Sequence, residues 1–173
     1  MATRVDFAFG ASDRLRMACE VVRKHHAAGR RVVVYTRDMQ HLARFDRLLW
    51  GFDATAFVPH VMADDPLAQD TPVLLATSLA SLPAAGSPLD TETDAGGPPA
   101  DQEPFSPKPV DTTDSWWLLN LDHDCPPEAP VFGRILEIVS NQEDDRQQAR
   151  ARWRQYHASG HALHAHDVSG RQP

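Results

Sequence analysis

The sequence predicts an α/β domain with three layers, α/β/α, in which helices cover both faces of a mostly parallel or mixed sheet. One observation is that short β-branched or apolar runs alternate along the chain with longer segments of helical period. Such alternation favours parallel strands joined by right-handed helical crossovers. A second observation is that 42% of the 173 residues are hydrophobic, which is enough to bury a sizeable core in one domain.

The first half of the chain contains two strand and helix pairs. VDFAF at 5–9 is a short strand candidate. Ser12 is positioned to cap the helix that follows, and Gly29 is expected to end that helix. VVVY at 32–35 is a β-branched run short enough to be a buried strand. The segment DMQHLARFDRLLW at 38–50 then returns to helical period.

The second half adds strands around one segment of different composition. Further strand candidates are PVLLAT at 72–77, WWLLNL at 116–121, RILEIV at 134–139 and ALHAHDV at 162–168. Residues 80–114 are rich in Pro, Gly, Ala, Asp and Thr, and nearly free of large apolar side chains. Such a segment cannot recover its ordering entropy by burial. We therefore expect one domain over 1–173 with a flexible insert at about 80–114.

A basic, aromatic helix is expected near the end of the chain, at about 142–159. Ser140 and Asn141 can cap this helix, the acidic EDD at 143–145 lies in its first turn, and Gly160 can end it. Five side chains fall within one arc of roughly 100° on the helix: Arg146, Arg150, Trp153, Arg154 and His157.

Arginines beside an indole can hold a carboxylate by charge-assisted hydrogen bonds while an apolar ring packs alongside. Ala149 and Tyr156 lie on the neighbouring arc, which suits the core. The alternative is a solvated arginine face on which Trp153 only closes the core.

A second aromatic group follows the helix expected at 38–50. Trp50, Phe52 and Phe57 lie within eight residues and are followed by Pro59. These rings could form an exposed apolar patch suited to a protein partner, or they could belong to the core. The pair Trp116 and Trp117 is expected in the core because it begins a continuous apolar strand.

Several classes of function are not supported by the sequence. It contains no glycine-rich phosphate loop of either common kind and no nucleophile elbow, so the expected Rossmann-like fold lacks a nucleotide site and no enzyme is predicted. The histidines near the C-terminus have irregular spacing for a metal site, and Cys19 and Cys125 lack metal-ligand spacing, so neither a metal nor a cofactor is predicted.

Charge and hydropathy bound the partners and the compartment. The net charge is -7 and the pI is about 5.6, so any contact with nucleic acid must be local. No apolar run approaches the roughly 18 residues needed to cross a bilayer, and we expect a cytoplasmic protein that does not contact membranes.

Two long segments together resemble the chi subunit family of bacterial DNA polymerase III, a clamp-loader accessory. They are GRRVVVYTRDMQHLARFDRLLWGFDATAFVPH, with its LW and FVPH, and EIVSNQEDDRQQARARWRQYHASGHAL. The resemblance implies a single α/β domain without catalytic activity. It also implies an adaptor in DNA replication, which binds the acidic, phenylalanine-ending C-terminal tail of single-stranded-DNA-binding protein and contacts DNA only indirectly.

The resemblance places two sites on this chain. The tail-binding residues it implies are Arg146, Arg150, Trp153 and Arg154, with Val139 at the edge. The surface it implies for the small psi subunit of the clamp loader contains Phe57, with Trp50, Pro59 and His60. Direct binding of single-stranded nucleic acid through the same basic helix is the alternative function.

Overall fold

The computed structural model describes residues 3–51, 57–82, 116–126 and 132–170, which form seven strands, three α-helices and two 3-10 turns. In chain order the strands and α-helices are β1 (Arg4–Ala11), α1 (Arg14–Ala27), β2 (Val32–Tyr35), α2 (Met39–Gly51), β3 (His60–Met62), β4 (Val73–Ala76), β5 (Trp117–Asn120), β6 (Arg134–Ser140), α3 (Glu143–Ala158) and β7 (Ala162–Asp167).

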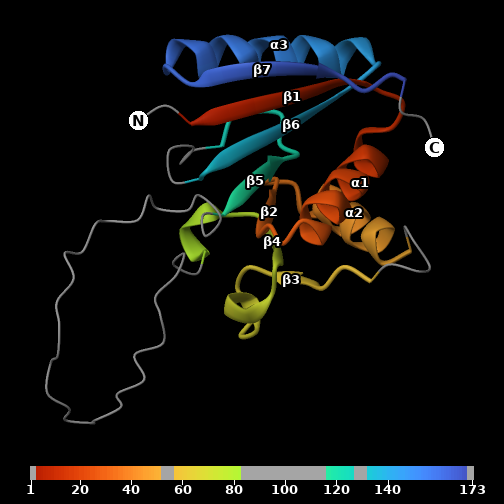
Figure 1. Ribbon diagram of the computed structural model, residues 1–173, viewed down its shortest axis with the longest axis vertical. Helices are drawn as coiled ribbons and strands as arrows, with labels where there is room; N and C mark the ends of the chain where they lie inside the picture. Colours follow the sequence, from red (N-terminus) through yellow and green to blue (C-terminus); the bar gives the residue numbers. More distant parts are fainter. Residues whose placement is uncertain (1–2, 52–56, 83–115, 127–131, 171–173) are drawn as a thin grey trace, which may run out of the picture.

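The strands form one sheet in the order β3-β4-β2-β5-β6-β1-β7, and every pair of neighbours is parallel. Helices α1 and α2 cover one face of this sheet and α3 covers the other (Figure 1). The three-layer α/β/α prediction is confirmed, and among the described strands the sheet is parallel throughout.

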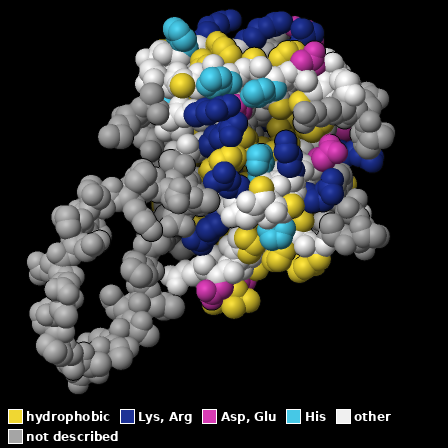
Figure 2. Space-filling model, viewed as in Figure 1, with side chains coloured by type: hydrophobic (Ala, Val, Ile, Leu, Met, Phe, Trp, Pro, Cys, Tyr) yellow, Lys and Arg dark blue, Asp and Glu magenta, His cyan; other side chains and the backbone are white. Residues whose placement is uncertain are grey.

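Charged side chains are unevenly distributed over this fold. On the face seen in Figure 2, Lys, Arg and His side chains form a band across the region where β1 and β6 begin. The chain as a whole carries a net charge of -7. Basic groups are therefore concentrated locally on an acidic protein.

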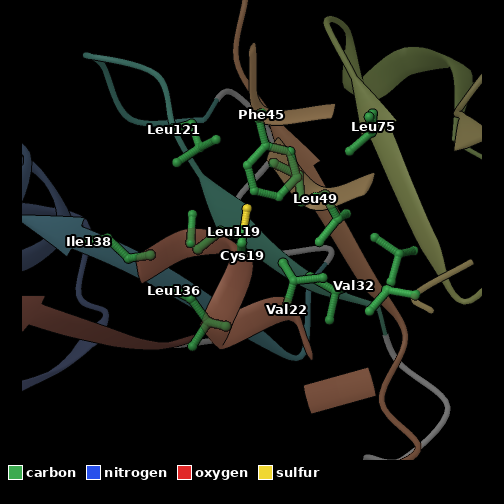
Figure 3. Packing of buried hydrophobic residues seen from close by; sticks show 14 of the residues in the cluster. Cys19, Val22, Val32, Phe45, Leu49, Leu75, Leu119, Leu121, Leu136 and Ile138 are labelled. Carbon is green, nitrogen blue, oxygen red and sulfur yellow. The ribbon is translucent and has the colours of Figure 1, made fainter. Parts of the chain in front are cut away.

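The core lies on both sides of the sheet. On one side, Cys19 and Val22 of α1 and Phe45 and Leu49 of α2 pack onto side chains of the sheet (Figure 3). The sheet contributes Val32, Leu75, Leu119, Leu136 and Ile138 to this contact, and Leu121 joins them directly after β5. The central strands β2, β4 and β5 are buried at every position, as expected for strands that are covered on both faces.

The first strand divides its side chains between these two sides. Val5 and Phe7 belong to the cluster beneath α3, whereas Ala8 packs against the cluster beneath α1 and α2. Alternation along an extended strand places successive side chains on opposite faces. The VDFAF segment therefore serves both layers of the core.

The ends of several elements differ from the sequence predictions. Asp13 caps α1 in place of Ser12, and its carboxylate accepts a hydrogen bond from the backbone N–H of Arg16 at 3.1 Å. Gln142 is the residue before α3, so the predicted caps Ser140 and Asn141 were one or two residues early. The three-residue strand β3 was not predicted, because so short a run carries no clear period.

Other sequence predictions of local structure are confirmed. Gly29 and Gly160 follow α1 and α3 with φ angles of 77° and 81°. Trp116 and Trp117 are both buried. All but residues 80–82 of the predicted insert at 80–114 lies outside the described residues. No helix in the described part of the chain is long and apolar enough to cross a membrane.

The topology marks one position at the carboxyl edge of the sheet. The chain leaves β1 through α1 toward β2, and it leaves the neighbouring strand β6 through α3, on the opposite face, toward β7. Adjacent strands whose connections run in opposite directions leave a crevice outside their carboxyl ends, where ligands of open α/β sheets commonly bind.

Candidate functional site

A buried ion pair fixes α3 on the sheet. Glu137 in β6 and Arg152 in α3 are each only 1% exposed. Arg152 Nε donates a hydrogen bond to Glu137 Oε2 at 3.0 Å. Tyr156 Oη and Asn120 Nδ2 donate to Glu137 Oε1 at 2.7 and 2.8 Å. Burial and the neighbouring Glu137 carboxylate raise the pKa of Tyr156, which keeps its hydroxyl protonated as a donor.

This anchor determines which side of α3 faces the solvent. Ala149, Arg152 and Tyr156 are the buried residues of the helix. Arg146 and Arg150 lie on the exposed side, with side chains that are 51% and 55% accessible. The ion pair thus presents these two guanidinium groups outward, next to the carboxyl ends of β1 and β6.

A groove of about 360 Å³ opens at this position, between the start of α3 and the strands β1, β6 and β7. Its lining combines guanidinium groups with aromatic and aliphatic side chains. The lining residues are Phe7, Phe9, Gly10, Val139, Ser140, Asn141, Arg146, Ala149, Arg150, Trp153 and Ala165.

The aromatic part of the groove is held by ring contacts. Trp153 is half-buried, and its ring centroid lies 5.0 Å from that of Phe7 at an interplanar angle of 59°. Phe7 in turn contacts Tyr156 edge-on at 6.0 Å. Phe9 is 42% exposed. Tilted rings at these separations are favourable, so the groove offers a preformed apolar surface.

Gly10 shapes the carboxyl end of β1. It has a φ of 87°, and the register with β6 shifts between Phe9 and Ala11, as at a β-bulge. A Cβ at this position would lie 3.0 Å from Cβ of Ser169. Glycine is therefore required both by the backbone angle and by the close approach of the chain after β7.

The two groove arginines share one intramolecular carboxylate. Glu143, in the first turn of α3, lies 3.7 Å from Arg146 Nη1 through Oε2 and 3.6 Å from Arg150 Nη1 through Oε1. All three side chains are more than half exposed, so these contacts are weak and exchange readily with solvent. The arginines are therefore oriented toward a carboxylate and remain accessible to a competing one.

The structure brings together four of the five residues predicted for this site. Val139, Arg146, Arg150 and Trp153 line the groove, whereas Arg154 is exposed on α3 and does not line it. Phe7 and Phe9 were missed, although the alternation of VDFAF places both on one face of the strand. Glu143 was assigned only to the helix dipole, yet it contacts both arginines.

The second predicted surface, at the end of α2, is partly exposed. Trp50 and Phe57 are 58% and 66% exposed, and their ring centroids lie 5.4 Å apart. His60 is buried beneath them, 4.8 Å from the Trp50 ring, and its Nε2 pairs with Asp46 at 2.8 Å. Pro59 is half-buried, and Phe52 lies outside the described residues.

Several histidine and cysteine side chains pack against or hydrogen-bond to neighbouring groups of the fold. The described residues contain no cluster of side chains that could hold a metal ion. His161 Nδ1 accepts from the backbone N–H of Thr3 at 3.1 Å, and His166 Nε2 lies 2.8 Å from a carboxylate oxygen of Asp6. Burial raises the pKa of Cys19 to about 12 and that of Cys125 to about 11. Neither thiol is an activated nucleophile.

Comparison with known proteins gives concordant matches over most of the chain. The family model described as "DNA polymerase III chi subunit, HolC" matches residues 2–93 and 95–164. DNA polymerase III subunit chi of Pseudomonas aeruginosa is 28% identical over 168 residues, which cover 95% of this chain and 96% of that protein. The Escherichia coli protein of the same name is 22% identical over 154 residues, with coverages of 89% and 85%.

We predict that Arg152→Ala destabilises the protein by about 3–5 kcal/mol, because it leaves the Glu137 carboxylate buried without its charged partner. The exposed Arg154→Ala on the same helix should change the unfolding free energy by less than about 0.5 kcal/mol. Urea denaturation of the two variants measures both values. Equal unfolding free energies for the two would show that the buried pair does not anchor α3.

Proposed function

The chain belongs to the DNA polymerase III chi subunit family, whose role is that of an accessory subunit in DNA replication, and from that membership we propose a more specific function. We propose that the protein is a non-catalytic adaptor. It binds the acidic, phenylalanine-ending C-terminal tail of single-stranded-DNA-binding protein at the groove beside α3. It links that protein to the clamp loader through the psi subunit.

The observation that carries the proposal is the composition of the groove. Arg146 and Arg150 line it together with the rings of Phe7 and Trp153. A ligand that ends in a carboxylate attached to an aromatic residue has both complementary parts within one residue. Charge-assisted hydrogen bonds and ring burial are then available at the same time.

Of the two groove arginines, Arg150 is the better candidate for the terminal carboxylate. It lies in the middle of α3, one turn from Arg146 and close to Trp153 in sequence, so a carboxylate on Arg150 leaves the attached ring next to the indole. Arg146, nearer the start of the helix, is left for an acidic side chain earlier in the tail. Arg154 contributes only to the general positive charge of this helix face.

Glu143 acts as an internal substitute for the tail carboxylate. It contacts both arginines, so the incoming tail must displace it. The cost is small because the contacts are longer than 3.5 Å and solvent-exposed. The exchange favours ligands with more than one carboxylate over isolated anions.

The exposed rings at the end of α2 are the proposed surface for the psi subunit. Trp50 and Phe57 are in contact with each other and face solvent, while His60 and Asp46 beneath them hold the segment in place. Exposed aromatic pairs on a rigid support are typical centres of protein interfaces.

Direct binding of single-stranded nucleic acid by α3 is a weaker candidate. The first turn of this helix carries Glu143, Asp144 and Asp145, which would lie among the phosphates of a strand bound along the arginines. A short peptide that ends at the groove avoids this repulsion.

We predict that Arg150→Ala weakens binding of an acidic, phenylalanine-ending peptide by about 10- to 100-fold, because a charge-assisted hydrogen bond contributes about 1.5–3 kcal/mol. Calorimetric titration at two salt concentrations measures the affinity. Higher salt should weaken the native protein in the same direction, since exposed charge pairs are screened within about 10 Å. Equal affinities for the native protein and a folded Arg150→Ala variant would contradict the proposed site.

The same titration with a peptide lacking its terminal phenylalanine separates the aromatic contribution. The loss of affinity on removing the phenylalanine should be nearly independent of salt, since ring burial against Phe7 and Trp153 involves no net charge. A salt-independent loss for the shortened peptide, together with a salt-dependent loss for Arg150→Ala, is the expected pattern.

We predict that Glu143→Gln strengthens peptide binding by about threefold or more, because the arginines lose their internal competitor. The control is Asp144→Asn, which makes the same change of net charge on the adjacent residue, where no ion pair is formed within the described part of the chain. Peptide titration of the two variants gives the comparison. An equal gain in both would assign the effect to net charge alone.

We predict that Phe57→Ala weakens the complex with the psi subunit and leaves peptide binding unchanged. Burial of a phenylalanine at an interface contributes about 1.5–3 kcal/mol, and the side chain is 66% exposed in the isolated chain. Leu67→Ala, at another large hydrophobic residue that is 61% exposed, is the matched control. Co-purification and titration with the psi subunit test both variants. An unchanged affinity of Phe57→Ala for psi would remove this surface from the proposal.

A further inference from the structure

A second concentration of positive charge lies on the sheet face opposite to α3. It gathers at the beginning of β1 and β6 and at the end of α1, in the band of Lys, Arg and His visible in Figure 2. We call this surface the basic face and define it by Arg4, Lys24, His25, Arg30 and Arg134. None of these residues lines the groove beside α3.

The arginines of the basic face are held in place by an indole. Arg30 and Arg134 place their Cζ atoms 4.9 and 4.8 Å from the centroid of the Trp117 ring, and the His25 ring lies 4.9 Å from it. Trp117 is 8% exposed, so these groups cover it. Cation–π contact of this kind fixes planar guanidinium groups before any ligand arrives.

One buried carboxylate is paired with two of these cations. Asp6, 5% exposed, accepts hydrogen bonds from Arg4 Nη2 at 3.0 Å and from Arg134 Nε. Two guanidinium groups thus share a single negative charge. Lys24 and Arg30 have no ion pair within the described residues, so the basic face keeps an excess of positive charge.

The pKa of His25 is affected by this excess, although burial is the larger cause. Burial, followed by the positive charges of Lys24, Arg134 and Arg30, lowers the pKa of His25 to about 4, and the charge of Asp6 acts in the opposite direction. The cations therefore outweigh the carboxylate at this position. An anion placed here would be attracted by at least three positively charged side chains.

The basic face borders a groove of about 520 Å³ between α1 and the strands β6, β1 and β7. Lys24, His25 and Arg134 form one end of it. Its apolar side consists of Ala8, Leu136, Ile138 and Val168, with Met17 and Val21 of α1, and the strands also place Asp6, Arg134, His166 and Asp167 in its lining. Three carboxylates also line it: that of Asp6, which is paired with Arg4 and Arg134, and those of Glu20 and Asp167.

We propose that this groove and the basic face bind single-stranded DNA. The phosphates lie on Lys24, Arg30 and Arg134, and an unpaired base enters the groove against its apolar side. Volumes of this size suit small planar ligands. A duplex keeps its bases stacked inside, so only a single strand can supply one, and planar guanidinium groups offer further stacking surfaces.

The carboxylates of Glu20 and Asp167 favour a base over an acidic peptide in the same groove. Glu and Asp accept hydrogen bonds from exocyclic amino groups such as N4 of cytosine. The same carboxylates would repel the acidic side chains of a peptide. The α3 groove, by contrast, has arginines beside aromatic rings, so the two surfaces differ in the ligand they suit.

The two sites lie on opposite faces of the sheet, which allows simultaneous occupation. The peptide groove is built on the side of Phe7 and Val139, and the proposed strand site is built on the side of Ala8 and Ile138. This inference does not depend on tail binding. The protein would contact both the strand and the protein that coats it.

The test is fluorescence anisotropy of a labelled oligodeoxycytidylate of about 20 nucleotides with the full chain, at about 0.05 and 0.2 M salt. The native protein should bind at the lower salt and lose affinity at the higher one. Lys24→Glu combined with Arg30→Glu should weaken binding by about tenfold or more and reduce the salt slope by about 1.4, since each phosphate contact on a single strand contributes about 0.7.

The matched control is Arg44→Glu combined with Arg47→Glu, two exposed positions on α2 with the same change of net charge. Equal weakening in both pairs, or no binding by the native protein at low salt, would overturn the proposal. Lys24→Glu alone, which leaves the Trp117 contacts intact, repeats the test if the double variant melts at a lower temperature.

Comparison with Arg150→Ala separates the two sites. Arg150→Ala should keep its affinity for the oligonucleotide while losing affinity for the acidic peptide, and Lys24→Glu should show the reverse. If the acidic peptide displaces the oligonucleotide from Arg150→Ala, the occupant of the basic face is a peptide and the proposal fails.

Discussion

The buried carboxylate of Glu137 is the constraint on which the rest of the molecule depends. A charge in the centre of a sheet must be paired and hydrogen-bonded by the layer that covers it. Arg152 and Tyr156 of α3 and Asn120 of β5 meet this requirement together. The rotation of α3 about its axis follows from these contacts, and with it the direction in which its remaining arginines point.

The strands and helices could largely be predicted because their signals are local. The β-branched run of β2 and the helical period of α2 follow from residues next to one another, and the structure contains both elements. The missed features have causes elsewhere in the chain. Strand β3 is too short to have a period of its own, and its buried residue His60 pairs with Asp46, which comes from α2.

The candidate groove was only partly predictable for the same reason. The spacing of Arg146, Arg150 and Trp153 indicates one helix face, and those three residues do line one groove. Arg152 belongs to the same run of arginines but is buried, because its partner Glu137 comes from a preceding strand. Phe7 reaches the groove only through the pairing of β1 with β6, which no helical pattern can indicate.

The position of β1 between β6 and β7 has a consequence for the order of folding. Residues 4–11 form the strand made first, and both of its neighbours, residues 134–140 and 162–167, come from the last third of the chain. Contacts of such long sequence separation form slowly, because a large loop must close before they are gained. During synthesis the first strand therefore has no strand to pair with until β6 has been made. A chain interrupted before β6 lacks the Glu137 carboxylate that anchors α3, and it lacks the groove. Completion of translation and competence for binding are thereby coupled.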